Sequence, residues 1–102
     1  MSQADAVTKI KINESVKEPS MFRVVYLNDN QTTMEFVVES LIEFFDYTTE
    51  TAVKITEDIH VSGHATVAVL PFEIAEQKGH EVLHSARSQN YPLQIEIKPD
   101  GV

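Results

Sequence analysis

Apolar and polar residues follow one another along the chain in patterns that predict three strands and three helices. Residues 22–27 form a β-branched and aromatic run that stops at polar turn residues, so we expect a strand that enters a turn. Thr32 and Glu35 then match the capping box that begins a helix. Apolar residues recur at helical spacing from there on: Met34, Val37, Val38, Leu41, Ile42 and Phe45.

A second helix is expected between two recognisable end signals. It begins at Thr48 or Thr49, which suit a helix N-terminus, and it ends at Gly63, which suits a helix C-terminus. Thr56 and His60 lie one turn apart on a shared face of this helix. Its inward residues are expected to be Ala52, Ile55 and Ile59.

Residues 65–97 predict a strand, a helix and a strand. Residues 65–70 form an apolar strand, and Pro71 suits the first position of a third helix that runs to about Ser88. Residues 93–97 alternate apolar and polar side chains, which is typical of a half-buried strand. The predicted fold class is α+β, a compact single domain in the order β-α-α-β-α-β with a three-stranded sheet packed against three helices.

The first 20 residues differ from the rest of the chain. They are polar, lack a sustained period and an aromatic residue, and hold three lysines and three acidic residues. We therefore predict a mobile, flexible N-terminal extension over residues 1–20 and a core domain over residues 21–102.

Composition narrows the classes of partner and chemistry. Eight basic and 16 acidic residues give a net charge of −8, so nucleic acid is not an expected partner and cationic ligands are favoured. The chain has no cysteine, which excludes disulfides, thiolate metal sites and a cysteine nucleophile. Its apolar runs are far shorter than the ~20 residues that a membrane span needs. We expect a cytoplasmic protein without a membrane partner.

One sequence motif points to zinc hydrolysis. His80, Glu81 and His84 form HExxH, which on a helix places two imidazoles on one face with a glutamate as base. The helix's apolar residues predict a buried side that points away from both histidines: Ile74, Ala75, Val82, Leu83 and Ala86. Arg87 and Asn90 stand where an extended zinc motif needs Gly and His. We predict no catalytic residue, cofactor or metal site, and loose surface metal binding stays open.

A second group of polar residues follows the first strand. Asn28, Asp29 and Asn30 offer amide and carboxylate oxygens, and a neutral His60 imidazole would add an acceptor. An ammonium group, with three donors and a positive charge, suits such acceptors. The same residues also occur as ordinary turn and capping residues. If an apolar cavity adjoins them, the ligand is an amine with an apolar side chain, and the expected walls are Met34, Val37, Ile59 and Leu93.

Residues 22–37 combine a hydrophobic strand, the tripeptide Asn-Asp-Asn and a helix start of the T-P-M-E-F-V type. Ile-His-Val-Ser-Gly at 59–63, an acidic helix at 72–78 and Tyr-Pro-Leu at 91–93 follow. With these motifs the chain resembles, over roughly residues 22–97, the ClpS adaptors of the bacterial and plastid N-degron pathway. The resemblance implies the same fold and a non-enzymatic adaptor, which captures substrates with N-terminal Leu, Phe, Tyr or Trp. It also implies delivery to a ClpA- or ClpC-type AAA+ unfoldase coupled to the ClpP protease.

The resemblance also implies roles for single residues. Asn28 and His60 would contact the α-amino group of the substrate, while Asp29 and Asn30 shape the loop and its charge. Met34 would be the gate whose bulk rejects β-branched N-terminal side chains. The other residues that would wall the side-chain pocket are Thr32, Val37, Thr56, Ile59 and Leu93.

Glu73 and Lys78 match the surface that docks on the unfoldase's N-terminal domain, and the N-terminal extension matches the segment required for delivery. Three residues depart from the family pattern. Asn30 replaces a frequent Asp and should change affinity, Thr56 replaces a frequent Met and should enlarge or wet the pocket, and Thr33 replaces the usual Pro. We expect a monomer. Besides the cytoplasm, the plastid stroma is the other possible location. The alternatives are a ClpS-like interaction module without N-degron recognition and a small zinc hydrolase.

Overall fold

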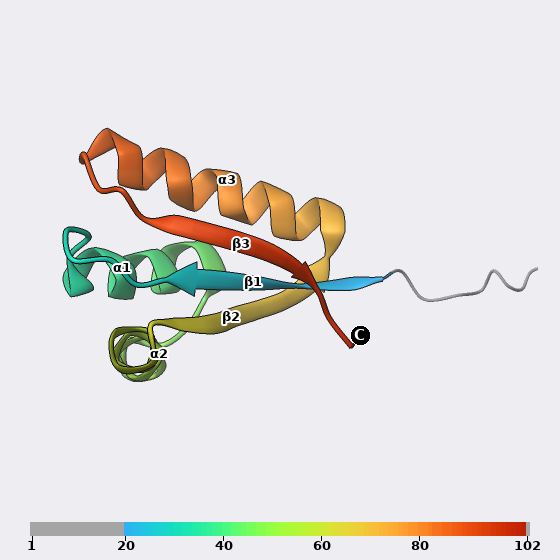
Figure 1. The fold of residues 1–102 in the computed structure, drawn as a ribbon, viewed down its shortest axis with the longest axis horizontal. Helices are drawn as coiled ribbons and strands as arrows, with labels where there is room; N and C mark the ends of the chain where they lie inside the picture. Colours follow the sequence, from blue (N-terminus) through green and yellow to red (C-terminus); the bar gives the residue numbers. More distant parts are fainter. Residues whose placement is uncertain (1–19, 102) are drawn as a thin grey trace, which may run out of the picture.

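The computed structural model describes residues 20–101, so the predicted extension lies outside the described residues except for Ser20. The predicted fold class and element order are confirmed (Figure 1). The elements are β1 (Met21–Leu27), α1 (Met34–Phe45), α2 (Thr49–Ser62), β2 (His64–Pro71), α3 (Phe72–Ser88) and β3 (Gln94–Pro99). Among these helices, none is long and apolar enough to cross a membrane.

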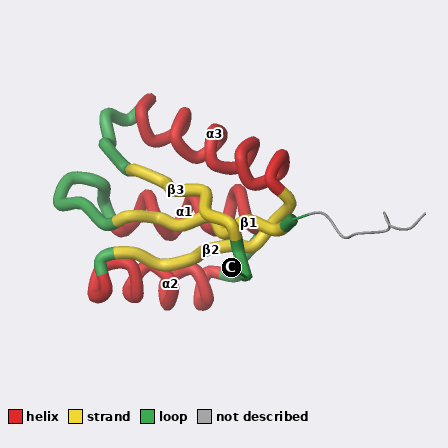
Figure 2. The backbone as a smooth tube through the Cα atoms, turned by 45° about the vertical axis from the view of Figure 1, so that its right-hand side comes forward, coloured by secondary structure: helices red, strands yellow, loops and turns green. Residues whose placement is uncertain are grey.

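The sheet has the order β2-β1-β3, and β1 pairs antiparallel with both neighbours. Val24 and Tyr26 lie in this central strand, are fully buried, and belong to a core cluster that includes residues of all three helices. Alternate residues of a strand point to opposite faces of the sheet. The three helices therefore cover one face of the sheet, and Figure 2 shows α1 behind the strands.

A β-bulge in β2 is the point where the segment between α1 and α2 is hydrogen-bonded to the sheet. Val24 pairs with Ala68 whereas Val25 pairs with Thr66, so Val67 is an extra residue in β2. The side chain of Val67 is buried in the core, and its carbonyl oxygen accepts a hydrogen bond from the Tyr47 hydroxyl. Because Tyr47 lies between α1 and α2, this bond fixes the helix pair against β2.

Two of the three predicted helix starts are shifted by one residue. The N-cap of α1 is Thr33 and not Thr32, and its hydroxyl accepts a hydrogen bond from the Phe36 N–H at 3.1 Å. Pro71 is the N-cap of α3 and not its first helical residue, because its backbone is still extended and pairs with Met21. In α2, the N-cap is Thr48, one of the two predicted starts, and Gly63 is the C-cap as predicted.

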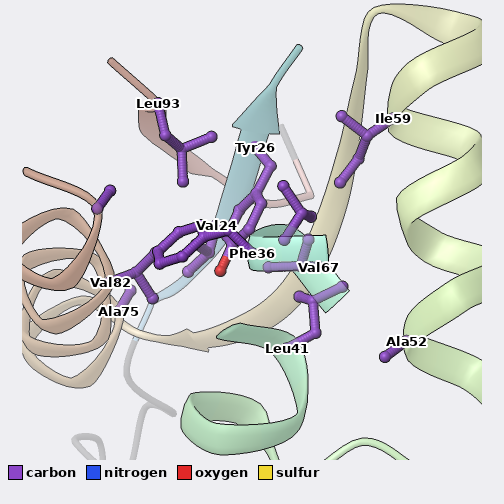
Figure 3. Packing of buried hydrophobic residues seen from close by; sticks show 12 residues of the cluster. Val24, Tyr26, Phe36, Leu41, Ala52, Ile59, Val67, Ala75, Val82 and Leu93 are labelled. Atoms are coloured by element: carbon purple, nitrogen blue, oxygen red, sulfur yellow. The ribbon is translucent and has the colours of Figure 1, made fainter. Parts of the chain in front are cut away.

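The buried side of α3 consists mainly of small residues, which are Ala75, Gly79, Val82 and Ala86. At 100° per residue these four lie within a narrow sector, and Ile74 lies about 110° from its centre. This explains why Ile74, predicted to face inward, is 44% exposed. Figure 3 shows the side chains of Ala75 and Val82 in the core beside Val24 and Phe36.

Candidate functional site

A backbone hydrogen bond joins the loop after β1 to the end of α2. The Asn28 N–H donates to the Gly63 carbonyl oxygen at 2.8 Å. Gly63 caps α2 with a left-handed backbone (φ 89°) that a residue with a Cβ adopts only under strain, and its own N–H donates to the Ile59 carbonyl. His60 lies in the last turn of α2 and is exposed. The structure thus brings the predicted amine-binding residues Asn28 and His60 to the same end of the molecule.

The carboxylate of Asp29 organises this loop. Oδ1 accepts hydrogen bonds from the N–H groups of Gln31 at 2.8 Å and Thr32 at 2.6 Å, and Oδ2 accepts from the Thr32 hydroxyl at 2.8 Å. Partial desolvation acts to raise the pKa of Asp29, but these hydrogen bonds and the charge of Arg87 outweigh it and hold the pKa below its ordinary value. The loop therefore carries a fixed negative charge. Asn30, on the same loop, is exposed.

The hydrogen bonds of Asp29 also explain the shifted start of α1. Thr32 was expected to cap the helix, but both its N–H and its hydroxyl already donate to Asp29. Thr33 is the next residue with a hydroxyl, and it takes the capping position. The turn and the helix thus use neighbouring threonines for separate tasks.

A third segment, which follows α3, completes this end of the molecule. The Arg87 Nη1 donates to the Tyr91 carbonyl oxygen at 2.9 Å, and the Thr33 hydroxyl donates to the Tyr91 hydroxyl at 3.4 Å. The Tyr91 ring packs on Phe36 with ring centroids 5.2 Å apart. No sequence pattern indicates a site role for Arg87 or Tyr91, because only the fold places a residue of α3 beside a loop that precedes α1.

A cleft of about 290 Å³ lies beside the loop and is lined by Leu27, Asn28, Asp29, Pro92 and Gln94. Two of these five residues, Asn28 and Asp29, were predicted to bind an amine. Pro92 and Gln94 were not predicted, although they flank Leu93, which was. The loop after β1 and the segment before β3 therefore enclose space next to the charged carboxylate.

The residues predicted to wall a side-chain pocket are mostly buried. Val37, Ile59 and Leu93 belong to the core cluster, and Figure 3 shows Ile59 and Leu93 within it. Thr32 is half-buried, and Met34 is the most open of these residues at 45% exposed. Val37, Ile59 and Leu93 are thus core residues, whereas Met34 lies at the surface.

Thr56 is also buried, at 2% exposed. Its hydroxyl donates to the Ala52 carbonyl oxygen one turn earlier in α2, at 2.8 Å. The hydroxyl therefore has a partner within its own helix. The enlargement or wetting of the pocket that is expected from Thr56 stays a prediction.

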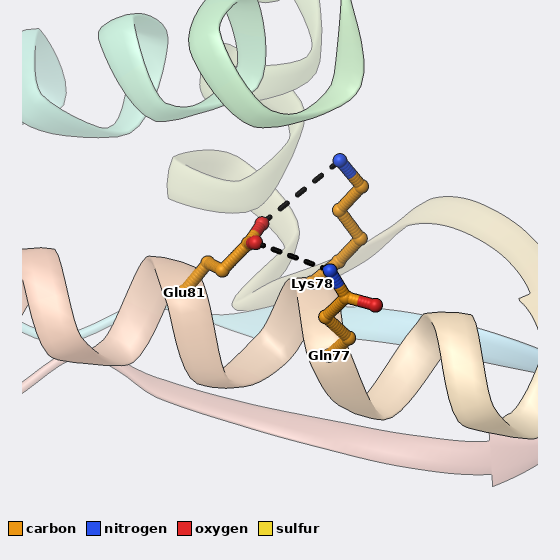
Figure 4. A network of polar contacts seen from close by, with 3 residues as sticks. All are labelled: Gln77, Lys78 and Glu81. Carbon is orange, nitrogen blue, oxygen red and sulfur yellow. Dashed lines mark hydrogen bonds and ion pairs between the residues drawn. The ribbon is translucent and has the colours of Figure 1, made fainter.

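The two predicted docking residues lie on α3, away from this site. Glu73 is exposed in the first turn of α3, beside the start of β1, and Figure 1 shows this end opposite the end of β1. Lys78 forms an ion pair with Glu81, with Nζ 3.9 Å from Oε1 (Figure 4). The structure does not bring Glu73 and Lys78 to the loop that holds Asn28 and Asp29.

The HExxH motif lies on the exposed side of α3. His80 and His84 are both exposed, which confirms the predicted orientation. In the part of the chain that the structure describes, no group of three or more histidine, cysteine, aspartate or glutamate side chains could hold a metal ion. A zinc hydrolase site, which needs three protein ligands, is therefore not formed by these residues.

Comparison with known proteins supports an adaptor. The family model described as ATP-dependent Clp protease adaptor protein ClpS matches residues 17–96. The ATP-dependent Clp protease adapter protein ClpS of Clostridium acetobutylicum is 42% identical, over 84% of this chain and 85% of the relative. The ClpS of Caulobacter vibrioides strain NA1000 is 38% identical, over 95% of this chain and 87% of the relative.

A solved structure of a ClpS protein has a similar fold. The structure of Agrobacterium tumefaciens ClpS2 bound to L-phenylalaninamide matches with a TM-score of 0.79 and 30% sequence identity, over 81% of this chain and all of that one. The family match spans most of the chain, and the relatives are adapters of the protease by name. The chain therefore belongs to the ClpS family, the non-catalytic adaptors of the ATP-dependent Clp protease.

Proposed function

We propose that the chain binds the free α-amino group and the bulky hydrophobic side chain of an N-terminal Leu, Phe, Tyr or Trp. It then delivers these N-degron substrates to a ClpA- or ClpC-type AAA+ unfoldase for degradation by ClpP. The observation that carries the proposal is the bond from Asn28 to Gly63, which brings the charged loop of Asp29 to the α2 end that holds His60. The Agrobacterium ClpS2 was solved with phenylalaninamide, which has a free amine next to an aromatic side chain.

The α-ammonium group would find both acceptors and a favourable field at this loop. The Asn28 side-chain oxygen and a neutral His60 nitrogen can accept its N–H bonds. The carboxylate oxygens of Asp29 already accept three hydrogen bonds from the loop itself, so Asp29 acts mainly through its charge. The positive charge of Arg87 lowers the pKa of Asp29, and it also offsets part of the loop's attraction for an ammonium.

The side chain of the N-terminal residue would enter between Met34 and the core residues below it. Val37, Ile59 and Leu93 are held in place by the packing of the core, so a pocket that they wall would be largely pre-formed. Met34 is exposed and can meet a branch at the Cβ of the ligand. Steric conflict there rejects Ile and Val, while Leu and the aromatic residues branch farther from the backbone.

The unfoldase would bind at the opposite end of the sheet. Glu73 is flanked by Phe72 and Ile74, which are 45% and 44% exposed. A cleft of about 390 Å³ adjoins them, lined by Ser20, Phe22, Pro71, Phe72, Glu73 and Ile74. Apolar side chains around a charge suit a protein partner. Because this surface and the amine-binding loop lie at opposite ends, a monomer can hold substrate and unfoldase at the same time.

The two ends also suggest how delivery works. Ser20, where the first 19 residues join the domain, lines the cleft at the docking end. We propose that residues 1–18 enter the unfoldase while the domain stays docked. The bacterial origin of the relatives supports a cytoplasmic location.

Peptide titration tests the recognition step. Peptides that begin with Leu, Phe or Trp should bind, and those that begin with Ile or Arg should bind far more weakly. Acetylation of the Leu peptide removes a charge and two donors, and should cost ~3 kcal/mol, a loss of about 150-fold in affinity. Equal binding of the acetylated peptide would leave an interaction module without N-degron recognition.

Met34→Ala tests the pocket. The variant should bind Ile- and Val-initiated peptides and retain its affinity for Leu, because the shorter side chain leaves room for a branch at Cβ. A variant that still excludes Ile and Val while binding Leu normally would mean that Met34 is not the gate.

A further inference from the structure

The two exposed histidines of α3 lie outside both ends used by the proposed function. At 100° per residue, His80 and His84 lie about 130° and 170° from the centre of the buried side of α3. Among residues 20–101, neither imidazole has a hydrogen-bond or ion-pair partner. The proposed adaptor function gives these two side chains no task.

The spacing of the histidines suits a shared ligand. Residues four apart on an α-helix have Cβ atoms about 5–6 Å apart on one face. From these positions two imidazole nitrogens can converge on one ion at the ~2.0–2.1 Å that zinc and nitrogen prefer. The 17-residue helix holds the two Cα atoms in place, because Val82 and Ala86 anchor this stretch in the core. The backbone therefore requires no rearrangement on binding.

The glutamate of the motif points elsewhere. Glu81 Oε1 lies 3.9 Å from the Lys78 ammonium, and Oε2 accepts from the Gln77 amide at 3.4 Å, as Figure 4 shows. Its carboxylate is therefore occupied on the flank of α3 that carries Gln77 and Lys78. No third histidine, cysteine, aspartate or glutamate completes a metal site among residues 20–101. The chemistry available to the pair is binding and not hydrolysis.

We propose that His80 and His84 form a surface site for one first-row transition-metal ion, with two imidazole ligands and water in the remaining positions. Imidazole suits Cu²⁺, Ni²⁺ and Zn²⁺, and the general order of divalent affinities favours Cu²⁺. The net charge of −8 attracts cations to the domain as a whole, while the paired imidazoles decide where a transition metal binds. Ca²⁺ and Mg²⁺, which prefer oxygen ligands, should not compete.

Metal binding at this pair has a consequence for folding. The helix presents both imidazoles in the folded chain, whereas the unfolded chain does not hold them together. An ion at 100 times its Kd should therefore lower the unfolding equilibrium constant about 100-fold. Thermal unfolding of the protein then depends on the metal concentration.

The test uses the full chain without a histidine tag, freed of metal by a chelator, and calorimetric titration with Cu²⁺, Ni²⁺ or Zn²⁺ alone. The wild type should bind one ion, and His80→Gln or His84→Gln should lower the affinity at least tenfold, because the loss of an outer-shell partner alone costs about 10–100-fold and these variants lose a direct ligand. His64→Gln removes an exposed histidine from β2 and serves as the matched control, which should bind like the wild type. The thermal midpoint should rise with metal in the wild type and the control only.

Two results would overturn the site. One is the absence of binding to the wild type at millimolar metal, and the other is binding that persists unchanged in the His80→Gln and His84→Gln double variant. Circular dichroism of each variant checks that it is folded. A Leu-initiated peptide titrated in parallel keeps this proposal separate from the adaptor function, because its affinity should be the same with and without the two histidines.

Discussion

The two ends of the sheet are built on different principles. At the end of β1, three hydrogen bonds to Asp29 and the bond from Asn28 to Gly63 fix a polar loop. At the start of α3, Phe72 and Ile74 remain about half exposed around a charged residue. A small ligand gives little binding area, so its site must be pre-organised, whereas a protein partner supplies area and tolerates an open apolar surface. The difference fits substrate recognition at the first end and docking at the second.

The largest expected contrast between the two ends is in how much each contributes to the stability of the fold. Leu93 is 1% exposed and belongs both to the core and to the proposed pocket, so Leu93→Ala should lower the free energy of unfolding by ~2–5 kcal/mol. Phe72 is 45% exposed and contacts the Phe22 ring edge-on at 5.0 Å, so Phe72→Ala should cost only ~1 kcal/mol. Urea unfolding of both variants measures the contrast. Equal losses would mean that the docking end is packed as firmly as the recognition end.

A medium effect concerns the loop charge and pH. Asp29→Asn should lower the free energy of unfolding by ~1–2 kcal/mol at pH 7, because charge-assisted hydrogen bonds become neutral ones. The folded-state pKa of Asp29 lies below the ordinary value of 3.8, so the folded state binds fewer protons around that pH than the unfolded state. The stabilisation is therefore present above pH ~4 and is lost as the pH falls through the folded-state pKa.

Urea unfolding of the wild type and the variant from pH 7 down to pH 2 measures this difference. The two proteins should become more alike in stability as the pH falls. A difference that is constant over the whole range would show that the charge of Asp29 contributes nothing. Glu35→Gln, an exposed carboxylate in the first turn of α1, is the matched control.

A smaller effect separates docking from recognition. Glu73→Lys reverses a charge at the edge of the apolar surface and should weaken binding to the unfoldase's N-terminal domain about fivefold, or ~1 kcal/mol. Leu-peptide affinity should stay unchanged, because the loop of Asn28 lies at the other end of the sheet. Conversely, His60→Ala should lower the affinity for the Leu-initiated peptide and leave the affinity for the unfoldase unchanged. A loss of both activities in either variant would contradict the separation of the two ends.

The comparison also shows what the sequence could predict. Local signals were sufficient for the elements, since the hydrophobic run of β1 and the caps Thr48 and Gly63 lie next to the structure they specify. Errors of one residue occurred where two functions compete for neighbouring residues, as with Thr32 and Thr33. The inward side of α3 was misjudged at Ile74, because Gly79 carries no apolar side chain yet lies against β3, near Ile95 and Ile97.

The site was harder to predict because its parts come from distant segments. Asn28, His60 and Leu93 lie in three segments far apart along the chain, so their residue types suggested a shared site and the resemblance to a family supported the grouping. Nothing in the local sequence indicates that Arg87 lowers the pKa of Asp29, or that Tyr91 packs on Phe36. Such contacts depend on how whole elements are aligned and cross one another, and the local residue pattern of one element does not specify this.

The smallest expected effect is at Thr56, where the resemblance to the family implies a frequent Met. The Thr56 hydroxyl donates to a helix carbonyl that the backbone of α2 can satisfy on its own, so Thr56→Val should change the free energy of unfolding by less than ~1 kcal/mol. The same variant should bind Leu- and Phe-initiated peptides like the wild type, because the methyl groups of valine present the same apolar surface. Thr56→Met, in contrast, should fill the space and disfavour Trp more than Leu, which parallel peptide titrations measure. If Thr56→Val alters the preference for the N-terminal residue and Thr56→Met does not, the hydroxyl contacts the ligand. The recognition end would then be less completely pre-formed than its comparison with the docking end implies.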